Sequence, residues 1–154
     1  MIGREGFLFF LLLSVMGCAQ PKYIKGNQGV GLGGAEKPSG TTCDLVFESE
    51  GLCMSWYWVQ EPTTQDSGKI LLKTFRLNHF DKTPVPASLS IAPVLTLWMP
   101  SMGHGSTPSV VSIVDIGTYL VEDVFFVMLG EWDLHFQIKV DGEVTDEVVV
   151  PIRI

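Results

Sequence analysis

The chain has 154 residues, which is enough for one domain with a sizeable hydrophobic core. Its formal net charge is −7, and no cluster of Lys and Arg interrupts the acidic composition. This balance argues against binding to nucleic acid, whose phosphates attract basic surfaces. We therefore expect no nucleic-acid partner.

The first 17 residues have the features of a secretory signal peptide. Arg4 precedes an apolar run, residues 7–15, which is far shorter than the roughly 20 residues that span a bilayer. The sequence Val-Met-Gly-Cys that ends at Cys18 resembles a bacterial lipobox. This resemblance implies cleavage after residues 1–17 and acyl chains on Cys18. The mature protein would then be a lipid-anchored membrane protein of the cell envelope, on the periplasmic face of the inner or outer membrane.

Residues 18–42 are expected to form a flexible tether between the lipid and the domain. The segment after Cys18 contains six glycines and two prolines and has few apolar side chains. Such a composition buries too little surface to offset the entropy lost on ordering. The folded domain is therefore expected to comprise residues 43–154.

Residues 43–154 show apolar side chains at alternate positions, in short runs that turn residues separate. This period indicates β-strands, and no helical periodicity of useful length is present. The expected strands are residues 43–48, 52–59, 69–77, 92–99, 108 or 109–116, 119–127, 132–140 and 147–154, with a loop over 78–90. Seven or eight such strands predict an all-β fold, an antiparallel two-sheet sandwich of immunoglobulin-like size with a Trp of the second strand in its core. A small barrel is the alternative.

Two cysteines remain in the domain once Cys18 carries lipid. Cys43 and Cys53 lie on either side of a predicted hairpin whose midpoint is Glu48. Opposite residues of a hairpin approach closely enough for a disulfide, and the envelope is an oxidising compartment. We expect a Cys43–Cys53 disulfide, with two buried thiols or a second soft-metal site as alternatives.

Residues 97–106 combine two thioethers and an imidazole, those of Met99, Met102 and His104. One proline and two glycines interrupt this segment, so we expect a loop rather than a strand. Thioethers are soft donors suited to Cu(I), and the absence of a carboxylate argues against a calcium or magnesium site. The alternative is that the methionines fill gaps in the core and His104 lies at the surface.

The direction of the strands predicts a third sulfur at the same site. If consecutive strands run antiparallel, the turn at residues 128–131 returns to the end of the domain that carries the loop. Met128 would then join the metal ligands, although a methionine at a strand end is also ordinary core. His79 falls at the opposite end by the same reasoning.

Three further residues near this end are candidates for supporting roles. His135 alternates with core residues of its strand and should face outward, so its role as a ligand or supporting group is the weaker hypothesis. Trp98 points away from Met99 and could form a hydrophobic wall that restricts water. Trp132 lies directly after the turn and is a further candidate for a supporting role.

The run Leu-Trp-Met-Pro-Ser-Met-Gly-His-Gly-Ser, followed by Gly-Thr-Tyr and Val-Phe-Phe-Val-Met-Leu-Gly-Glu-Trp-Asp-Leu, resembles the YtkA-like and FixH-like domain family. The resemblance covers residues 94–146. It implies a β-sandwich outside the cytoplasm that is associated with copper handling or with maturation of the copper site of cytochrome oxidase. Six residues match motif positions: Met99, Met102, His104 and Met128 as the donors, and Gly130 and Trp132 as the turn. FixH-like members are held by a transmembrane helix, whereas this chain has a lipobox.

These features favour a Cu(I)-binding envelope lipoprotein that acts as a copper carrier, chaperone or buffer. Its partner would be another copper protein or an oxidase-assembly protein. The alternative is a metal-free interaction module that docks its Met-rich and aromatic end on another envelope protein. We do not expect an enzyme, because the sequence has no nucleophile elbow, no paired carboxylates in a shared turn and no His-Glu-x-x-His motif.

Overall fold

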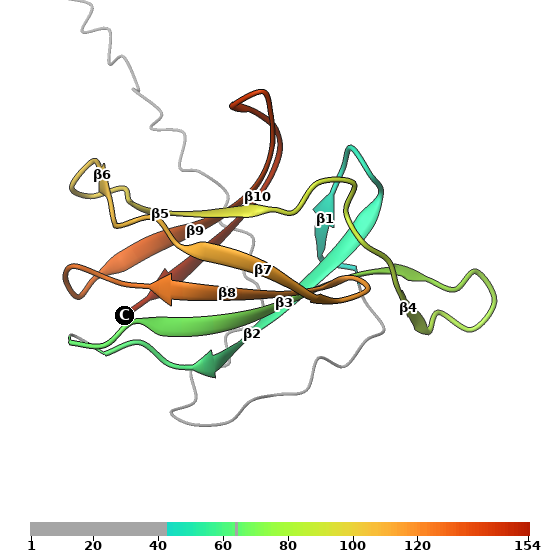
Figure 1. Cartoon of the computed structure of the whole chain (residues 1–154), viewed down its shortest axis with the longest axis horizontal. Helices are drawn as coiled ribbons and strands as arrows, with labels where there is room; N and C mark the ends of the chain where they lie inside the picture. Colours follow the sequence, from blue (N-terminus) through green and yellow to red (C-terminus); the bar gives the residue numbers. More distant parts are fainter. Residues whose placement is uncertain (1–42, 64) are drawn as a thin grey trace, which may run out of the picture. The chain divides into compact units, whose positions relative to one another are not determined.

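The computed structural model describes residues 43–63 and 65–154 (Figure 1). The predicted signal peptide, Cys18 and the tether up to residue 42 lie outside the described residues. The described part is all-β and forms two antiparallel sheets, which confirms the predicted fold class. Its ten strands exceed the seven or eight expected. They are β1 (Leu45–Phe47), β2 (Leu52–Gln60), β3 (Gly68–Leu77), β4 (Pro84–Pro86), β5 (Val94–Met99), β6 (His104–Gly105), β7 (Val110–Asp115), β8 (Thr118–Val124), β9 (Glu131–Val140) and β10 (Glu143–Arg153).

The first sheet has the strand order β1-β2-β3-β8-β7, and β4 adds to β3 beyond the end of β8. The second sheet has the order β10-β9-β5-β6. Figure 1 shows the β5–β6 turn and the β8–β9 connection at one end of the domain, with the β4 loop at the other end. Among the described residues there is no helix long and apolar enough to cross a membrane.

The core lies between the inward faces of the two sheets. The inward residues of β9 are all at most 3% exposed: Trp132, Leu134, Phe136 and Ile138. They face Ile70 and Leu72 of β3 and Val121 of β8, which have no exposed surface. This period of two is the pattern that predicted strands from the sequence.

The tryptophan at the centre of the core belongs to β9 rather than to β2. Trp56 of β2 packs against the core, with its ring 6.4 Å from that of Phe136, but remains only partly buried. Trp132 is completely buried. The expectation of a core Trp in the second strand therefore holds only in part.

The two additional strands lie in segments that we expected to be loops. β4 consists of Pro-Val-Pro and pairs only with β3. Proline lacks a backbone donor and is tolerated where only one side of a strand is paired. β6 lies within the predicted Met/His loop, and its geometry is described below.

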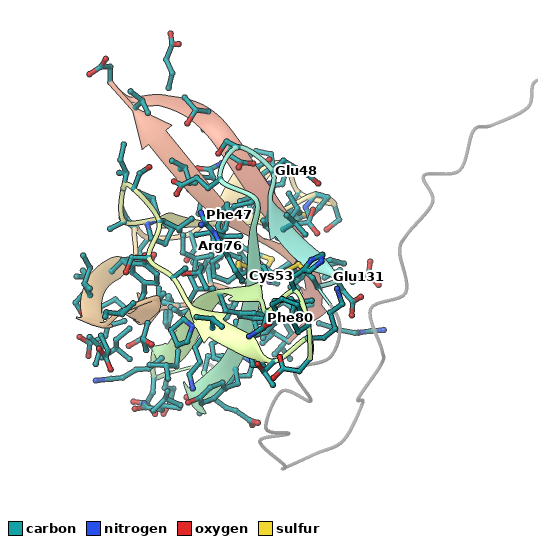
Figure 2. All side chains as sticks on the ribbon, turned by 90° about the vertical axis from the view of Figure 1, so that its right-hand side faces the viewer. Phe47, Glu48, Cys53, Arg76, Phe80 and Glu131 are labelled. Atoms are coloured by element: carbon teal, nitrogen blue, oxygen red, sulfur yellow. A yellow bond between two sulfur atoms is a disulfide. The ribbon has the colours of Figure 1, made fainter. Side chains whose placement is uncertain are left out.

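The predicted disulfide between Cys43 and Cys53 is present, with the two Cα atoms 5.2 Å apart (Figure 2, near the Cys53 label). Cys53 is 5% exposed and pairs with Val46 across the β1–β2 ladder. The bond therefore fastens the beginning of the described domain to a central part of the first sheet. This outcome excludes free thiols or a soft-metal site at these two positions in this structure.

Candidate metal centre

The segment predicted as a loop is a tight β-hairpin between β5 and β6. The carbonyl of Met99 accepts hydrogen bonds from the backbone N–H of Met102 (3.2 Å) and of Gly103 (2.9 Å). Pro100 occupies the second position of this turn, where its fixed φ is favourable, and Gly103 has φ +65°. Glycine adopts this conformation without the penalty that a side chain would carry. The proline and glycines thus belong to the turn between β5 and β6, and they do not prevent these strands from pairing.

The hairpin places Met99 and His104 directly opposite each other. Opposite residues in an antiparallel pair project from the same face, with Cβ atoms about 5 Å apart. Met99 is 3% exposed and belongs to the core, whereas His104 is half-buried. The two donors that are five positions apart in the sequence are therefore neighbours on the inward face of the second sheet.

The imidazole of His104 has one nitrogen fixed by the backbone. Its Nδ1 lies 3.0 Å from the carbonyl oxygen of Gly105. A carbonyl can only accept, so Nδ1 must carry the proton, and in the neutral ring Nε2 then has a free lone pair. Metal-binding histidines in proteins commonly have their second nitrogen held in this way.

Gly130 brings the turn at residues 128–131, which leads into β9, into contact with the β5–β6 hairpin. A Cβ at this position would lie 2.5 Å from the terminal methyl carbon of Met99, so the absence of a side chain permits the approach. Backbone hydrogen bonds between Gly130 and Ile154, at 3.0 and 3.1 Å, hold this glycine in place. In addition, the Ser106 hydroxyl donates to the Phe125 carbonyl. The predicted proximity of the two turns is confirmed.

Met128 lies in this second turn and is 40% exposed. Its carbonyl accepts a hydrogen bond of 3.1 Å from the indole Nε1 of Trp132, which fixes the turn to the start of β9. Met102, at the tip of the hairpin, is 60% exposed. We call the set Met99, Met102, His104 and Met128 the Met/His end. It contains one buried thioether, two exposed thioethers and one half-buried imidazole.

Aromatic rings lie directly beneath His104. The centroid of the Trp132 ring lies 6.0 Å from that of the imidazole, in an edge-to-face arrangement. The centroid of the Phe126 ring lies 5.3 Å from that of Trp132. Both aromatic residues are at most 2% exposed. Buried aromatic rings next to a site restrict the access of water and keep the local polarity low. These conditions favour a reduced, soft metal ion. The sequence suggested a supporting role for Trp132 but none for Phe126, which was placed in the predicted strand at 119–127 without a function.

Trp98 and His135 lie on the other face of the second sheet. Leu95, Leu97 and Met99 of β5 point into the core, so Trp98 points outward and is 39% exposed. It does not line the face that carries Met99 and His104. His135 also faces outward, as expected, and pairs across the ladder with Thr96.

His135 belongs to a separate polar group. Its Nδ1 lies 2.8 Å from Oε1 of Glu147, which also accepts a hydrogen bond of 2.6 Å from Gln137. Desolvation acts to raise the pKa of Glu147, but the hydrogen bonds from Gln137 and His135 outweigh it, and the pKa lies below its ordinary value. The structure therefore gives His135 a partner away from the Met/His end. His79 is exposed at the opposite end of the domain, as the sequence predicted.

Within residues 43–63 and 65–154, no group of three or more His, Cys, Asp or Glu side chains is arranged to hold a metal ion. The donors of the Met/His end are of a different kind, because three of the four are thioethers. Comparison with protein-family models, with curated proteins and with solved structures gave no match.

Proposed function

We propose that the Met/His end binds Cu(I) through Met99, Met102, His104 and Met128. The observation that carries the proposal is the pairing of Met99 with His104, whose Nδ1 is engaged by a carbonyl so that Nε2 is free to coordinate. Three thioethers and one imidazole form a soft, neutral ligand set, which favours Cu(I) over Cu(II) and Zn(II). The resemblance of residues 94–146 to the YtkA-like and FixH-like family supports the same choice of metal.

The unequal exposure of the donors favours a carrier, chaperone or buffer over a permanent metal centre. Met99 is 3% exposed, whereas Met102 and Met128 are 60% and 40% exposed. An incoming protein could replace the two outer thioethers one at a time while the inner pair still holds the ion. With the proposed lipid anchor on Cys18, the domain would exchange copper with another copper or oxidase-assembly protein at the membrane surface of the envelope.

A metal-free docking role is the second candidate. Val127 and Leu129, which flank Met128, are 47% and 66% exposed, and contiguous exposed apolar side chains often mark protein interaction sites. This surface would serve partner recognition in either case. The two functions differ in whether the isolated protein binds copper.

Competition with a chromophoric Cu(I) chelator under anaerobic reducing conditions tests the proposal. The soluble form should begin at Thr42, so that the Cys43–Cys53 disulfide is retained. We expect His104→Ala and Met102→Ala each to weaken binding at least about tenfold, because each loses a ligand of a small set. Silver(I), which is similarly soft, should compete with copper.

His79→Ala is the matched control, because it removes an exposed imidazole at the opposite end and should leave the affinity unchanged. Because a metal-bound imidazole must be unprotonated, the affinity should also fall in acid. Copper affinities that do not differ among wild type, His104→Ala and Met102→Ala would contradict the proposal and favour the docking role.

A further inference from the structure

The unpaired strand edges in the described part of the chain differ in how they are protected. Unpaired edges attract further strands, and proteins commonly protect them with short strands, prolines and charged residues. β1 has three residues and β6 has two, so residues 55–60 of β2 and 94–97 of β5 have no partner strand on that side. β4 has three residues, of which two are proline. The edge strand β10 is long but includes Pro151, Arg153 and three acidic residues, and a bulge interrupts it.

The edge strand β7 has none of these protections along most of its length. Its sequence is Val-Val-Ser-Ile-Val-Asp, with its single charge at the last position and a bulge only after Ile113. Val110, Ile113 and Val114 are 55%, 66% and 59% exposed. Ile113 pairs with the buried Tyr119 and so belongs to the inward face, yet the second sheet leaves it largely uncovered.

The sequence of β7 is symmetric about Ser112. Two β-branched residues precede this serine and two follow it. In an antiparallel pair of identical strands related by a two-fold axis through Ser112, Val111 lies opposite Ile113 of the second copy, and Val110 lies opposite Val114. The apolar inward residues thus meet each other, and Asp115 lies opposite Ser109 rather than opposite a second Asp115. A register centred on Ile113 would instead place Asp115 against Val111.

We propose that β7 pairs antiparallel with β7 of a second copy of this chain, with the two-fold axis at Ser112. The first sheets of the two copies then form one continuous sheet, and Ile113 is covered by the partner. The contact extends over five residues, or about 17 Å. It is smaller than the roughly 1,200 Å² of a stable interface, so the dimer should be reversible, with a dissociation constant in the micromolar range or weaker. This interface is independent of copper binding.

Cysteine cross-linking tests the register directly. The full chain carries Cys18→Ser, which removes the cysteine outside the disulfide, and is purified in mild detergent. With Ser112→Cys added, the two new thiols lie across the axis, where the Cα atoms of opposite residues are about 4.5–5.5 Å apart. This spacing permits a disulfide, so we expect a covalent dimer under mild oxidation. Ser112 is exposed, and its hydroxyl makes only a long contact of 3.5 Å with the Leu120 carbonyl, so the fold should tolerate the change.

Val110→Cys is the matched control, because two copies of this residue would lie about 13 Å apart in the proposed register. It should not cross-link to itself but should cross-link to a Val114→Cys chain. Equal cross-linking of Val110→Cys and Ser112→Cys would overturn the proposed register.

Sedimentation at increasing concentration supplies a second test. Ile113→Lys places a charge against Val111 of the partner and should weaken dimerisation at least about tenfold, since the charge must be desolvated. Val144→Lys, an equally drastic change at a 48% exposed position of β10, should have no effect. A chain that stays monomeric up to about 1 mM, or a dimer indifferent to Ile113→Lys, would contradict the proposal.

Discussion

Single residues decide whether the Met/His end can exist. Gly130 has φ +149° and leaves room for the terminal methyl group of Met99, so one turn can approach the other. His104 is oriented by the carbonyl of its neighbour Gly105 and by the ring of Trp132. The sequence motif named the candidate donor residues, but it contained no signal for the carbonyl that fixes the imidazole. That contact joins neighbouring residues and depends on the local backbone conformation of β6, which the sequence pattern did not predict.

Gly130→Ala should disturb both stability and copper binding. The new methyl group would lie 2.5 Å from the Met99 methyl carbon and would occupy a backbone conformation that favours glycine. We expect a loss of about 1–3 kcal/mol in the free energy of unfolding, measured by denaturant titration, together with weaker Cu(I) binding. Gly142→Ala is the control, because Gly142 also has positive φ but a Cβ there meets no atom within 4 Å. If the two variants bind copper equally well, the Gly130–Met99 contact is irrelevant to the site.

Glu147→Ala should reduce stability in a pH-dependent manner. The pKa of Glu147 is held below its ordinary value, so its stabilising contribution is fully present above the ordinary glutamate pKa and is lost as the pH falls through the lower folded value. The variant should therefore be less stable than wild type by about 1 kcal/mol at neutral pH, where His135 and Gln137 lose their acceptor. Urea titrations at neutral and strongly acidic pH measure this difference, which should shrink in acid. Glu143→Ala, an exposed acid of the same strand, should show no such trend.

Among the strands, alternation of apolar residues predicted the longest ones well, because these bury one face in the core. β9 illustrates this, since its buried residues are every second one from Trp132 to Ile138. β4 and β6 were not predicted, because their pairing depends on contacts with β3 and β5 and not on a face to be buried. Proline and glycine suggested loops in both segments. In the structure the prolines lie in the edge strand β4, and Pro100 and Gly103 lie in the turn between β5 and β6.

The Cys43–Cys53 disulfide should stabilise the β1–β2 hairpin. It closes a short loop, with a separation of 10 residues, so the loss of chain entropy in the unfolded state predicts roughly 2–3 kcal/mol. Denaturant unfolding with and without reductant should show this difference, with Cys43→Ser/Cys53→Ser as a second measure. Detection of two free thiols in oxidised, denatured protein would contradict the bond.

The two proposed functions of the domain lie at different places in the fold. The Met/His end lies where the β5–β6 and β8–β9 turns meet, and the proposed dimer uses the β7 edge of the first sheet. The proposed anchor on Cys18 belongs to the part of the chain before residue 43. The two-sheet architecture could be predicted from the number and length of the strands. Which strands lie at the sheet edges could not be predicted, because this depends on the strand order that the structure shows.

The anchor predicts a change in how the whole protein partitions. Mature protein with lipid on Cys18 should enter the detergent phase and carry the mass of diacylglyceryl and acyl groups, because acyl chains supply the membrane affinity. Cys18→Ser should release the protein from membranes or leave the precursor uncleaved. A Cys18→Ser protein that remains membrane-bound at the mature size would show that another feature holds it.

The proposed binding of Cu(I) by Met99, Met102 and His104 can be tested in one chelator competition on a combined variant. Because Met99 is buried, its sulfur should be removed without loss of volume, as in Met99→Leu/Met102→Leu/His104→Ala. Met54→Leu, at a methionine that is 4% exposed in β2, controls for a change of core packing. We expect Met54→Leu to bind Cu(I) like wild type, whereas the triple variant, although folded, should lose measurable binding. Equal Cu(I) affinities for wild type and the triple variant would contradict the metal centre.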